Sequence, residues 1–529
     1  MKNSAQTAGP AEETSSSATP TVQMTPDDAM PPIELVFGLV GPTGVDLDRA
    51  IDSLKAQLAA VQYDSIVISL SDLILGFHGK ENFPNEHDRI SELIESGNRL
   101  RESADDRSIV ARLGLVEIRE QRKKISGFEN VPHKQRRIAY IVRSFKRPEE
   151  VLLYRDVYGK AFTLISLYAS KSTRIKNLSK RILGGEIDAR QAESLATDLV
   201  NRDNKEEGQP YGQRVGSTFP MADYFASFGP RVRLDNQFKR LVRLTFGDPY
   251  ISPTKEEEGM FFAQAAALRS LDLSRQVGAA LFSEHGEIIS TGCNDVPKAG
   301  GGLYWTDDNS FRDHELGYDA NVAIKKELVA DAYRRLREAK QLSPSTLEKS
   351  DQALATEALF GNAPHFKESL LFDVIEFGRA VHAEMDAITQ AARVGASTKN
   401  GRLFCTTFPC HICARHIVSA GLKDVFFIEP YEKSRTGELF ADSISIEPSE
   451  PSAKLVNFHA FVGVAPRRYM DFFQATSPRK NGDGTIIGEE KIAKFPKVKR
   501  IVLAYTLAEE QSVKEIPPSI FEPRQGDQA

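Results

Sequence analysis

Two short motifs in the second half of this chain constrain its fold more than any other feature. The first reads HAE at residues 382–384, and the second reads PCHIC at residues 409–413. A helical pattern over residues 382–394 and the strand-like run RLFCTT separate them, and a second helical pattern covers residues 409–420. A helix, a strand and a helix in succession are typical of an α/β layer. We therefore expect the starts of the two helices to face the same space.

The second motif offers two sulfur ligands for a metal. Cys410 and Cys413 are three residues apart at the start of a helix that Pro409 opens, so both sulfurs lie on one side of the first turn. The partial positive charge of a helix N-terminus favours the thiolate, which is the form that binds metal. His382 can add a neutral imidazole. One His and two Cys leave the fourth position of a tetrahedral zinc open, which is typical of a catalytic site.

Glu384 follows His382 by two residues and can reach a water in that open position without being a ligand. Zinc lowers the pKa of such a water. Glu384 can accept the water's proton, protonate N3 of a cytosine ring and later give a proton to the departing amine. The residues follow the H-x-E … P-C-x-x-C order of zinc-dependent deaminases, in which hydroxide attacks C4 of cytosine. A C-x-x-C alone would also fit a redox or structural role, and an HAE triplet alone occurs by chance.

Other cysteines and histidines near the motifs have structural interpretations. We expect Cys293 and Cys405 to be core residues on strands, and His411 and His416 to face solvent or the core. Four cysteines in 529 residues are too few for a disulfide scaffold.

Composition limits the class of protein. Hydrophobic residues make up 41% and charged residues 27%, as in ordinary globular proteins. The formal net charge of −5 gives no general attraction to polyanions, so a nucleic-acid binder would need a local basic patch. The N-terminal segment lacks the apolar core of a signal peptide, and no apolar run is long enough to cross a membrane. We therefore expect a cytoplasmic protein.

Pattern changes divide the chain into three parts. Residues 1–30 are rich in Ser, Thr, Ala, Pro and acids, and we expect a disordered tail there. Residues 31–249 alternate strand-like runs with helical runs, beginning with IELVFGLVG and DLDRAIDSLKAQLAAV, which predicts a parallel α/β sheet. Residues 250–529 form the second predicted domain. It contains a predicted hairpin around His285 and a long polar and helical insertion at about residues 300–371.

A glycine-rich turn, GLVGPTG, follows the first predicted strand and precedes the first helix, where a phosphate cradle would lie. The candidates for nucleotide contacts are Gly38, Gly41 and Gly44. A Walker A motif needs Lys and then Ser or Thr after the last glycine, but this chain has Val45 and Asp46. Backbone amides could still bind a phosphate, and a turn without a ligand explains the glycines equally well. We expect no phosphoryl transfer, and we expect Asp46 to cap the helix.

Several stretches of the chain carry a resemblance to a known family. Residues 260–475 resemble the deoxycytidylate deaminase branch of the zinc-dependent cytidine deaminase superfamily. The stretches that carry this resemblance are SRQVGAALFSEHGEIISTGCNDVP, VHAEMDAI and LFCTTFPCHICARHIVSAGL. Through RSLDLSRQVGAAL, PKAGGGLYW and FVGVAPRRYMDFF, the whole chain is similar to bacterial anti-phage dCTP/dCMP deaminases. Those proteins join a P-loop-kinase-like domain to a deaminase domain. The resemblance implies a three-layer α/β/α deaminase fold with a mixed sheet, zinc at His382, Cys410 and Cys413, and Glu384 as the acid and base.

The resemblance also implies substrate contacts and a biological role. Asn294, in the segment GCNDVP, matches the Asn that contacts the sugar, although a turn residue would also fit. Arg275 is a candidate for phosphate contact, and so are Lys298, Lys433 and Arg467, each of which also fits a solvated surface charge. The implied role is depletion of dCTP during phage infection, by conversion to dUTP or dUMP. Control in that family involves a partner, an RNA in characterised systems, and we expect a homo-oligomer.

Two other functions remain open. A deaminase of single-stranded DNA or RNA would need a basic groove with stacking aromatics, and no such run lies near the motifs. A scaffold or sensor protein could keep zinc for stability, but a structural site does not need Glu384. The leading prediction is deamination of free dCTP, with dCMP as a second substrate. The insertion at about residues 300–371 is long enough to cover a pocket, which would exclude a continuous strand of nucleic acid.

Overall fold

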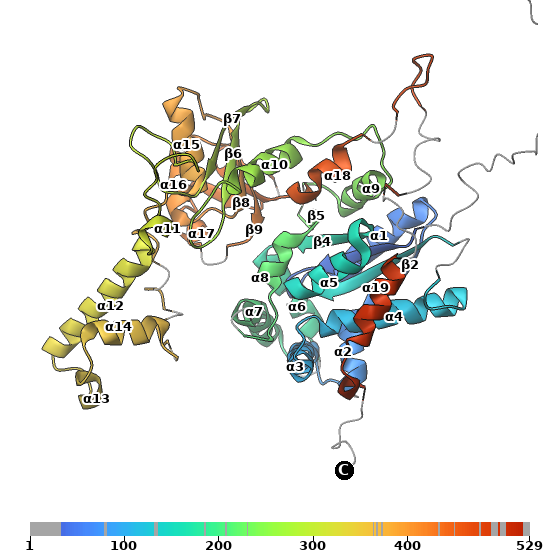
Figure 1. Ribbon diagram of the computed structural model, residues 1–529, viewed down its shortest axis with the longest axis horizontal. Coiled ribbons are helices and arrows are strands. Elements are labelled where there is room, and N and C mark those ends of the chain that lie inside the picture. The colour runs from blue at the N-terminus through green and yellow to red at the C-terminus, as the bar shows by residue number, and fades with distance from the viewer. Residues whose placement is uncertain are drawn as a thin grey trace, which may run out of the picture.

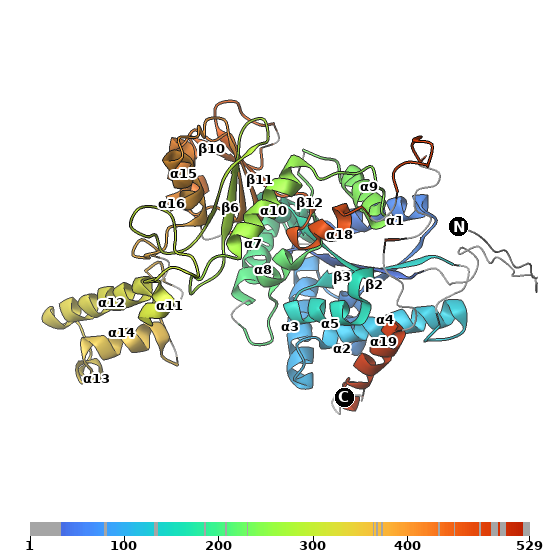
Figure 2. The same cartoon turned by 45° about the horizontal axis from the view of Figure 1, so that its top comes forward.

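The chain is an α/β protein built around two sheets that lie side by side, each with helices on both faces (Figures 1 and 2). The predicted tail at residues 1–30 lies outside the described residues. No described helix combines the length and the apolar character that crossing a bilayer requires. The computed structural model describes residues 33–78, 82–131, 136–184, 187–206, 209–229, 231–362, 364–366, 369–371, 374–431, 434–448, 450–475, 478–487, 496–497 and 504–521.

The first sheet has the order β12-β5-β4-β1-β3-β2 among the described residues. Every neighbouring pair is parallel except β12 and β5, so the parallel sheet predicted from the sequence is confirmed. All six residues of β1 are buried, because helices cover both faces of the sheet. The strands are β1 (Leu35–Val40), β2 (Asp64–Ser69), β3 (Ile138–Phe145), β4 (Phe162–Tyr168), β5 (Tyr224–Ser227) and β12 (Gly463–Val464).

Helices on the two faces of this sheet form two separate apolar cores. One core joins α1 and α9 to one face, and the other joins α2, α4 and α5 to the opposite face. The carboxylate of Asp46 accepts a hydrogen bond from the backbone N–H of Arg49 at 3.1 Å, which confirms the predicted cap of α1. The helices are α1 (Leu47–Ala60), α2 (Leu70–His78), α3 (Glu86–Ala104), α4 (Ile109–Ser126), α5 (Pro148–Tyr158), α6 (Lys171–Ile182), α7 (Ala189–Glu206), α8 (Val215–Thr218) and α9 (Leu234–Thr245).

The second sheet is mixed and has the order β10-β11-β9-β8-β6-β7. The predicted hairpin is confirmed, because β6 and β7 pair antiparallel, while β8, β9, β11 and β10 run parallel to one another. Helix α10 packs on one face, and α15 packs on the other with α16 beside it. The elements are α10 (Lys255–Ala267), β6 (Gly278–Phe282), β7 (Ile288–Cys293), α15 (Ala383–Arg393), β8 (Arg402–Thr407), α16 (His411–Ser419), β9 (Asp424–Glu429), α17 (Thr436–Leu439), β10 (Ile444–Ile446) and β11 (Val456–Ala460).

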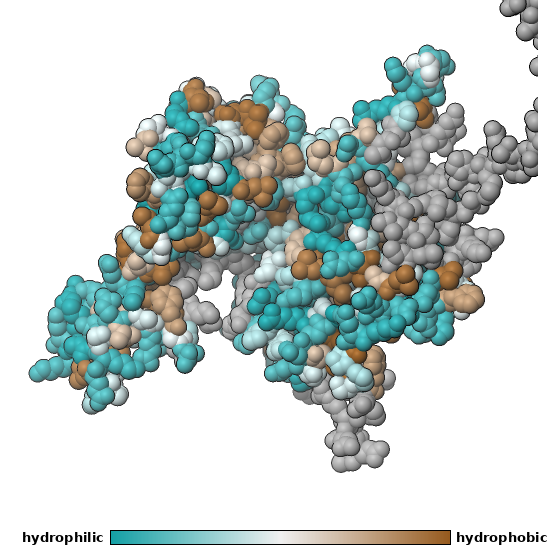
Figure 3. All heavy atoms as spheres, in the orientation of Figure 1, coloured by the Kyte–Doolittle hydropathy of each residue, from teal (hydrophilic) through white to brown (hydrophobic). Residues whose placement is uncertain are grey.

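The insertion between β7 and α15 forms a helical arm that projects away from the second sheet (Figures 1 and 2). Helices α12 and α14 pack on each other around a small core of their own. The visible face of the arm is largely hydrophilic (Figure 3), as the polar composition predicted. The helices are α11 (Asp313–Leu316), α12 (Ala320–Glu338), α13 (Pro344–Leu347) and α14 (Asp351–Phe360).

The C-terminal part of the chain returns to the first sheet, which differs from the single second domain over 250–529 that the sequence suggested. Strand β12 pairs with β5, and its residue Val464 donates a backbone hydrogen bond at 2.9 Å to the buried carboxylate of Glu257 in α10. This hydrogen bond therefore links β12 of the first sheet to α10, which packs on the second sheet. The remaining elements are α18 (Tyr469–Phe473), α19 (Ala504–Lys514) and the 3-10 turns at Gly159–Ala161, Phe219–Met221, Pro466–Arg468 and Pro518–Ile520.

Helix α19 is fixed to the first half by a buried ion cluster. The guanidinium of Arg122 in α4 contacts Glu509 of α19 at 2.7 Å and Glu34 at 2.8 Å. The hydroxyl of Tyr158 donates a further hydrogen bond to Glu509 at 2.7 Å. These three charged side chains are at most 4% exposed, so each depends on the others to compensate for lost hydration.

We predict that Arg122→Met destabilises the protein strongly, because it leaves two buried carboxylates without their partner. The expected loss is about 3–5 kcal/mol in the free energy of unfolding, measured by urea denaturation. Lys123→Met is the matched control, since Lys123 lies next in α4 but is exposed and pairs with Glu129 at the surface. Equal stability of the two variants would show that the cluster does not hold α19.

Candidate active site

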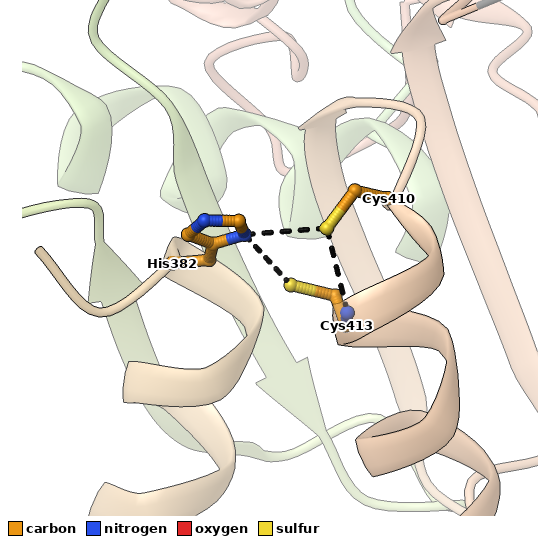
Figure 4. A group of neighbouring side chains, drawn as sticks. All are labelled: His382, Cys410 and Cys413. Atoms are coloured by element: carbon orange, nitrogen blue, oxygen red, sulfur yellow. Dashed lines mark hydrogen bonds between the residues drawn. The ribbon is translucent and has the colours of Figure 1, made fainter. Parts of the chain in front are cut away.

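The side chains of His382, Cys410 and Cys413 converge as the two motifs predicted (Figure 4). His382 Nδ1 lies 3.3 Å from Cys410 Sγ and 3.3 Å from Cys413 Sγ. The three ligand atoms all lie within 4.8 Å of one another, and both cysteines are buried. In the described part of the chain, no other cluster of at least three His, Cys, Asp or Glu side chains is close enough together to hold a metal ion.

This arrangement fits zinc. Bond lengths of about 2.3 Å to sulfur and about 2.0 Å to nitrogen put the ligand atoms of a tetrahedral site roughly 3.5 Å apart. The measured separations from His382 are close to that value. One imidazole and two sulfurs are the donor types that zinc favours, and three protein ligands leave one coordination position for a water or a substrate.

Helix ends position these side chains. His382 is the N-cap residue of α15, and Cys410 is the N-cap residue of α16, so the second helix begins at His411, two residues later than the sequence suggested. Cys410 Sγ accepts a hydrogen bond from the backbone N–H of Cys413 at 3.5 Å, as the cap of a helix does. The orphan N–H groups of the first turn thus point toward the sulfur and stabilise negative charge on it.

Electrostatics at the cysteine pair favour a thiolate. Hydrogen bonds from the Cys413 thiol and from His382 lower the pKa of Cys410 to about 4, against the opposing effect of burial. The contact with Cys410, together with burial, raises the pKa of Cys413. Cys410 is therefore ready to bind metal at neutral pH, whereas metal binding must displace a proton from Cys413.

Glu384 lies in the first turn of α15 and is 4% exposed. Its Oε2 is 3.4 Å from Cys413 Sγ, so the carboxyl group reaches the edge of the metal site. Burial raises the pKa of Glu384, and the nearby negative charge of Cys410 raises it further. A raised pKa makes the protonated form of this carboxyl group easier to reach, which suits a group that exchanges protons with its surroundings.

A cavity of about 310 Å³ opens beside His382 and Glu384. One wall is the segment 272–277 before β6, and a second wall carries Phe408 and Cys410 at the start of α16. Residues of α11 and the start of α12, together with the segment 375–380 before α15, complete the lining. The insertion therefore borders the cavity only at the base of the arm, because α12 and α14 use their apolar faces on each other.

Arg275 and Asn294, the two predicted substrate contacts, both line this cavity. The amide oxygen of Asn294 accepts from the N–H of Val277 at 2.7 Å, and its amide nitrogen donates to the carbonyl of Arg275 at 2.8 Å. Asn294 therefore fixes the wall of the cavity and retains one further donor and one further acceptor position. The guanidinium of Arg275 is half exposed and contacts Glu429 at 3.3 Å.

Sequence reasoning missed Arg379, a second cation in the lining of the cavity. It contacts Asp313 at 2.7 Å and donates to the carbonyl of Phe311 at 2.9 Å, so it joins the two ends of the insertion. The neighbouring Arg312 pairs with Asp295 at 3.3 Å in a fully buried contact. The only signal in the sequence was a cation three residues before His382, which is too common to interpret alone.

Neither Lys298 nor Arg467 lines this cavity. Lys298 pairs with Asp308 at 2.6 Å, and Arg467 contacts Asp223 in the first half of the molecule. Lys433 lies outside the described residues. Cys293 and Cys405 are buried at the end of β7 and within β8, as expected for core residues, and burial raises the pKa of Cys293 to about 12.

The glycine-rich turn of the first half has structural reasons for its glycines. Gly38 lies within β1, where a Cβ atom would approach the rings of Phe145 and Phe162 to 2.8 Å. Gly44 has a φ of +93°, and a Cβ atom there would lie 2.7 Å from the carbonyl oxygen of Arg174. The turn therefore needs glycine at these two positions whether or not a ligand is bound.

Residues 253–429 match the family model described as the cytidine and deoxycytidylate deaminase zinc-binding region. The match includes all three candidate zinc ligands and Glu384. This part of the chain is similar to deaminase zinc-binding regions.

Relatives of the deaminase domain come from bacteria and phages. ComE operon protein 2 of Bacillus subtilis (strain 168) is 33% identical over 81 residues, which are 15% of this chain and 43% of that protein. The deoxycytidylate deaminases of Enterobacteria phages T2 and T4 are 39% identical over 57 residues, or 11% of this chain and 30% of theirs. The chain thus spans less than half the length of these curated relatives.

Among solved structures, the dCMP deaminase of cyanophage S-TIM5 is similar in its apo form, with 15% identity and a TM-score of 0.21. Its complex with dCMP and dUMP gives 16% identity and a TM-score of 0.22. Both comparisons cover 40% of this chain and 99% of the phage protein.

We predict that Cys410→Ser and Cys413→Ser each remove zinc from the candidate metal site, because two protein ligands hold the metal too weakly. Elemental analysis of the purified protein should fall from about one zinc per chain to nearly none. Cys293→Ala and Cys405→Ala are the controls and should retain the metal, since both side chains are buried in the core and neither belongs to the three-residue cluster. Loss of zinc in the Cys293 variant would overturn the ligand assignment.

Proposed function

We propose that this chain is a zinc-dependent enzyme that deaminates free deoxycytidine nucleotides, with dCTP as the main substrate and dCMP as a second. The observation that carries the proposal is the buried Glu384 beside the His382, Cys410 and Cys413 cluster, at the wall of a cavity. A site that only stabilised the fold would have no use for a buried carboxyl group that opens onto such a cavity.

The chemistry is hydrolysis of the C4–amine bond. When bound, zinc lowers the pKa of a water in the open coordination position, so that hydroxide is available near neutral pH. Glu384 takes one proton from the water and delivers it to N3 of the cytosine ring. Once the oxygen has bonded to C4, Glu384 takes the second proton from that hydroxyl group and gives it to the exocyclic amine, and the C4–N bond breaks to release ammonia. Water and cytosine thus give uracil and ammonia. The buried environment that raises the pKa of Glu384 suits a group that must accept and donate in one cycle.

The size and charge of the cavity favour a single nucleotide. Its volume of about 310 Å³ lies at the lower end of the range for small-molecule sites, which is roughly 300–1,000 Å³. Arg275 and Arg379 supply cations for the phosphates, each after releasing a carboxylate partner. We assign the remaining amide positions of Asn294 to the sugar. A substrate with phosphates should therefore bind better than the free nucleoside.

A polynucleotide deaminase is the principal alternative. Because only α11 and the start of α12 line the cavity, shielding by the rest of the arm no longer argues against it. The remaining argument is electrostatic, since three aspartates, Asp272, Asp313 and Asp319, line the cavity beside its two arginines. A strand of nucleic acid would bring further phosphates past these carboxylates, whereas a free nucleotide brings only its own. A zinc scaffold without catalysis is the second alternative, and Glu384 argues against it.

The wider role follows the same proposal. We infer that the enzyme acts in the cytoplasm as a homo-oligomer and depletes dCTP during phage infection. The first half of the chain would then serve as a regulatory domain that receives a signal from a partner such as an inhibitory RNA. Val45 and Asp46 replace the Lys and hydroxyl residues of a Walker A motif, so we do not assign phosphoryl transfer to it. Efficient phosphorylation of a nucleotide by the full chain would contradict this role.

Glu384→Ala should abolish turnover while the zinc remains bound. Loss of a positioned acid and base lowers the rate by about 10²–10⁴-fold, and the ligands of the metal are unchanged. The readout is uracil nucleotide formed from dCTP, with zinc content and the unfolding curve as controls on the same sample. A variant that keeps zinc and deaminates at the normal rate would transfer the proton role to another group.

Substrate preference should follow the order dCTP, dCMP and then cytosine in a single-stranded oligonucleotide. The physical reason is that the cavity offers two cations and no extended basic track. The test is an assay of the zinc-loaded protein at equal cytosine concentration and at two salt concentrations. Faster uracil formation in the oligonucleotide, weakening steeply with salt, would favour the polynucleotide alternative.

A further inference from the structure

A buried ion pair connects the insertion to the segment that follows β7. Nε of Arg312 lies 3.3 Å from a carboxylate oxygen of Asp295, and the two residues are 4% and 2% exposed. Arg312 is the N-cap residue of α11, at the base of the arm (Figure 1). Asp295 directly follows Asn294, which lines the cavity beside His382 and Glu384. The pair therefore ties the base of the arm to a wall of that cavity.

The backbone of Asp295 is tied in turn to the metal site. The N–H of Val381 donates a hydrogen bond to the carbonyl oxygen of Asp295 at 3.0 Å, and the two residues form an isolated antiparallel bridge. Val381 directly precedes His382. The carboxylate oxygen of Asp295 that does not face Arg312 accepts from the N–H of Val296 at 2.7 Å. One residue is thus held both by the base of the arm and by the neighbour of a candidate zinc ligand.

The same short segment carries the side chain that we assign to the sugar. The carbonyl oxygen of Asn294 accepts a hydrogen bond from the buried hydroxyl of Ser270 at 2.6 Å. A direct path runs from Asn294 through Asp295 and its hydrogen bond with Val381 to His382. The position of Asp295 therefore affects how far the sugar contact lies from the metal.

The pair is costly to displace because both of its charges lie out of water. Another nitrogen of Arg312 donates a hydrogen bond to the carbonyl oxygen of Tyr304. Nε of Arg312 and the facing oxygen of Asp295 have no hydrogen-bond partner among the described residues, so the opposite charge alone compensates them. A movement that separated the two would leave two buried charges uncompensated, which costs more than the pair itself contributes. The pair therefore holds the segment after β7 in one position.

A second ion pair at the base of the arm behaves differently. Arg379 contacts Asp313, and both residues line the cavity, so a substrate phosphate can compete for this guanidinium. Neither Asp295 nor Arg312 lines the cavity. Their pair therefore stays closed when a nucleotide enters, and it can act as a fixed reference for the cavity wall.

We propose that Asp295 and Arg312 are positioning residues, whose ion pair sets the place of Asn294 relative to His382 and thereby the affinity for the nucleotide. They act through Asn294, because their own side chains lie behind the wall of the cavity. The inference rests on the proposed function, which assigns the sugar to Asn294 and zinc to His382.

The test measures steady-state deamination of dCTP by the full zinc-loaded chain. Arg312→Met leaves a buried carboxylate without its partner and should lower the stability, whereas the double variant Asp295→Asn/Arg312→Met removes both charges and should regain most of it. We expect both variants to raise KM by at least about tenfold and to change kcat per bound zinc by less than about threefold. A pair with a merely structural role gives the opposite result, because KM then returns to the wild-type value in the double variant together with the stability.

A matched control and a conservative variant separate this pair from the arm as a whole. Arg337→Met is the same substitution in an ion pair within the arm, where Arg337 contacts Asp351 at 2.9 Å, and it should leave KM unchanged. Arg312→Lys keeps a cation opposite Asp295 and should give a KM between those of the wild type and Arg312→Met. An equal rise of KM in Arg337→Met would overturn the proposal.

Hydrogen–deuterium exchange supplies a readout that does not depend on deamination. The amide of Val381, protected by the carbonyl of Asp295, should exchange at least about tenfold faster in the double variant than in the wild type, and at the wild-type rate in Arg337→Met. If the wild-type protein deaminates no cytosine nucleotide, the proposed function fails and this exchange alone decides the positioning role. Unchanged exchange at Val381 in the double variant would then refute it.

Discussion

The close approach of α15 to β7 is the constraint on which the catalytic site depends. A Cβ atom on Gly292 would lie 2.2 Å from the carbonyl oxygen of Ala383, so only glycine allows the helix to rest on the strand at this depth. This contact fixes the start of α15, which carries His382 and Glu384. The other ligand pair begins α16, which follows β8 in the same sheet. Two helix starts held by one sheet thus bring residues 382 and 410–413 to hydrogen-bond distance.

Burial then sets the chemistry of the residues that the fold has gathered. The same low exposure raises the pKa of Glu384 and opposes ionisation of the cysteines, yet the contact with Cys413 lowers the pKa of Cys410. A carboxyl group with a raised pKa and a thiol with a lowered one therefore coexist in one site. In the first half of the molecule, burial leaves some arginine donors, such as Nε of Arg101, without a hydrogen-bond partner among the described residues.

The sequence predicted the elements whose evidence is local. Hydrophobic runs and turn residues indicated the parallel sheet of the first half and the β6–β7 hairpin, and spacing alone grouped His382, Glu384, Cys410 and Cys413. It did not predict Arg379 or the wall formed by the ends of the insertion, because those contacts join residues far apart in the chain. Nor did it predict that β12 and α19 return to the first sheet, since their anchors are Glu257 and Arg122, which no local pattern marks.

What the sequence determined by itself is the chemistry of the metal site, because a helix start fixes the relation of Cys410 to Cys413 and of His382 to Glu384 within one turn. What only the tertiary structure decided is the surroundings of each candidate group. Gly38 has aromatic rings where a phosphate was considered, and Asn294 uses one donor and one acceptor to hold the cavity wall. The physical reason is that ligand spacing within a turn is set by the backbone, whereas burial and charge come from every segment that packs around it.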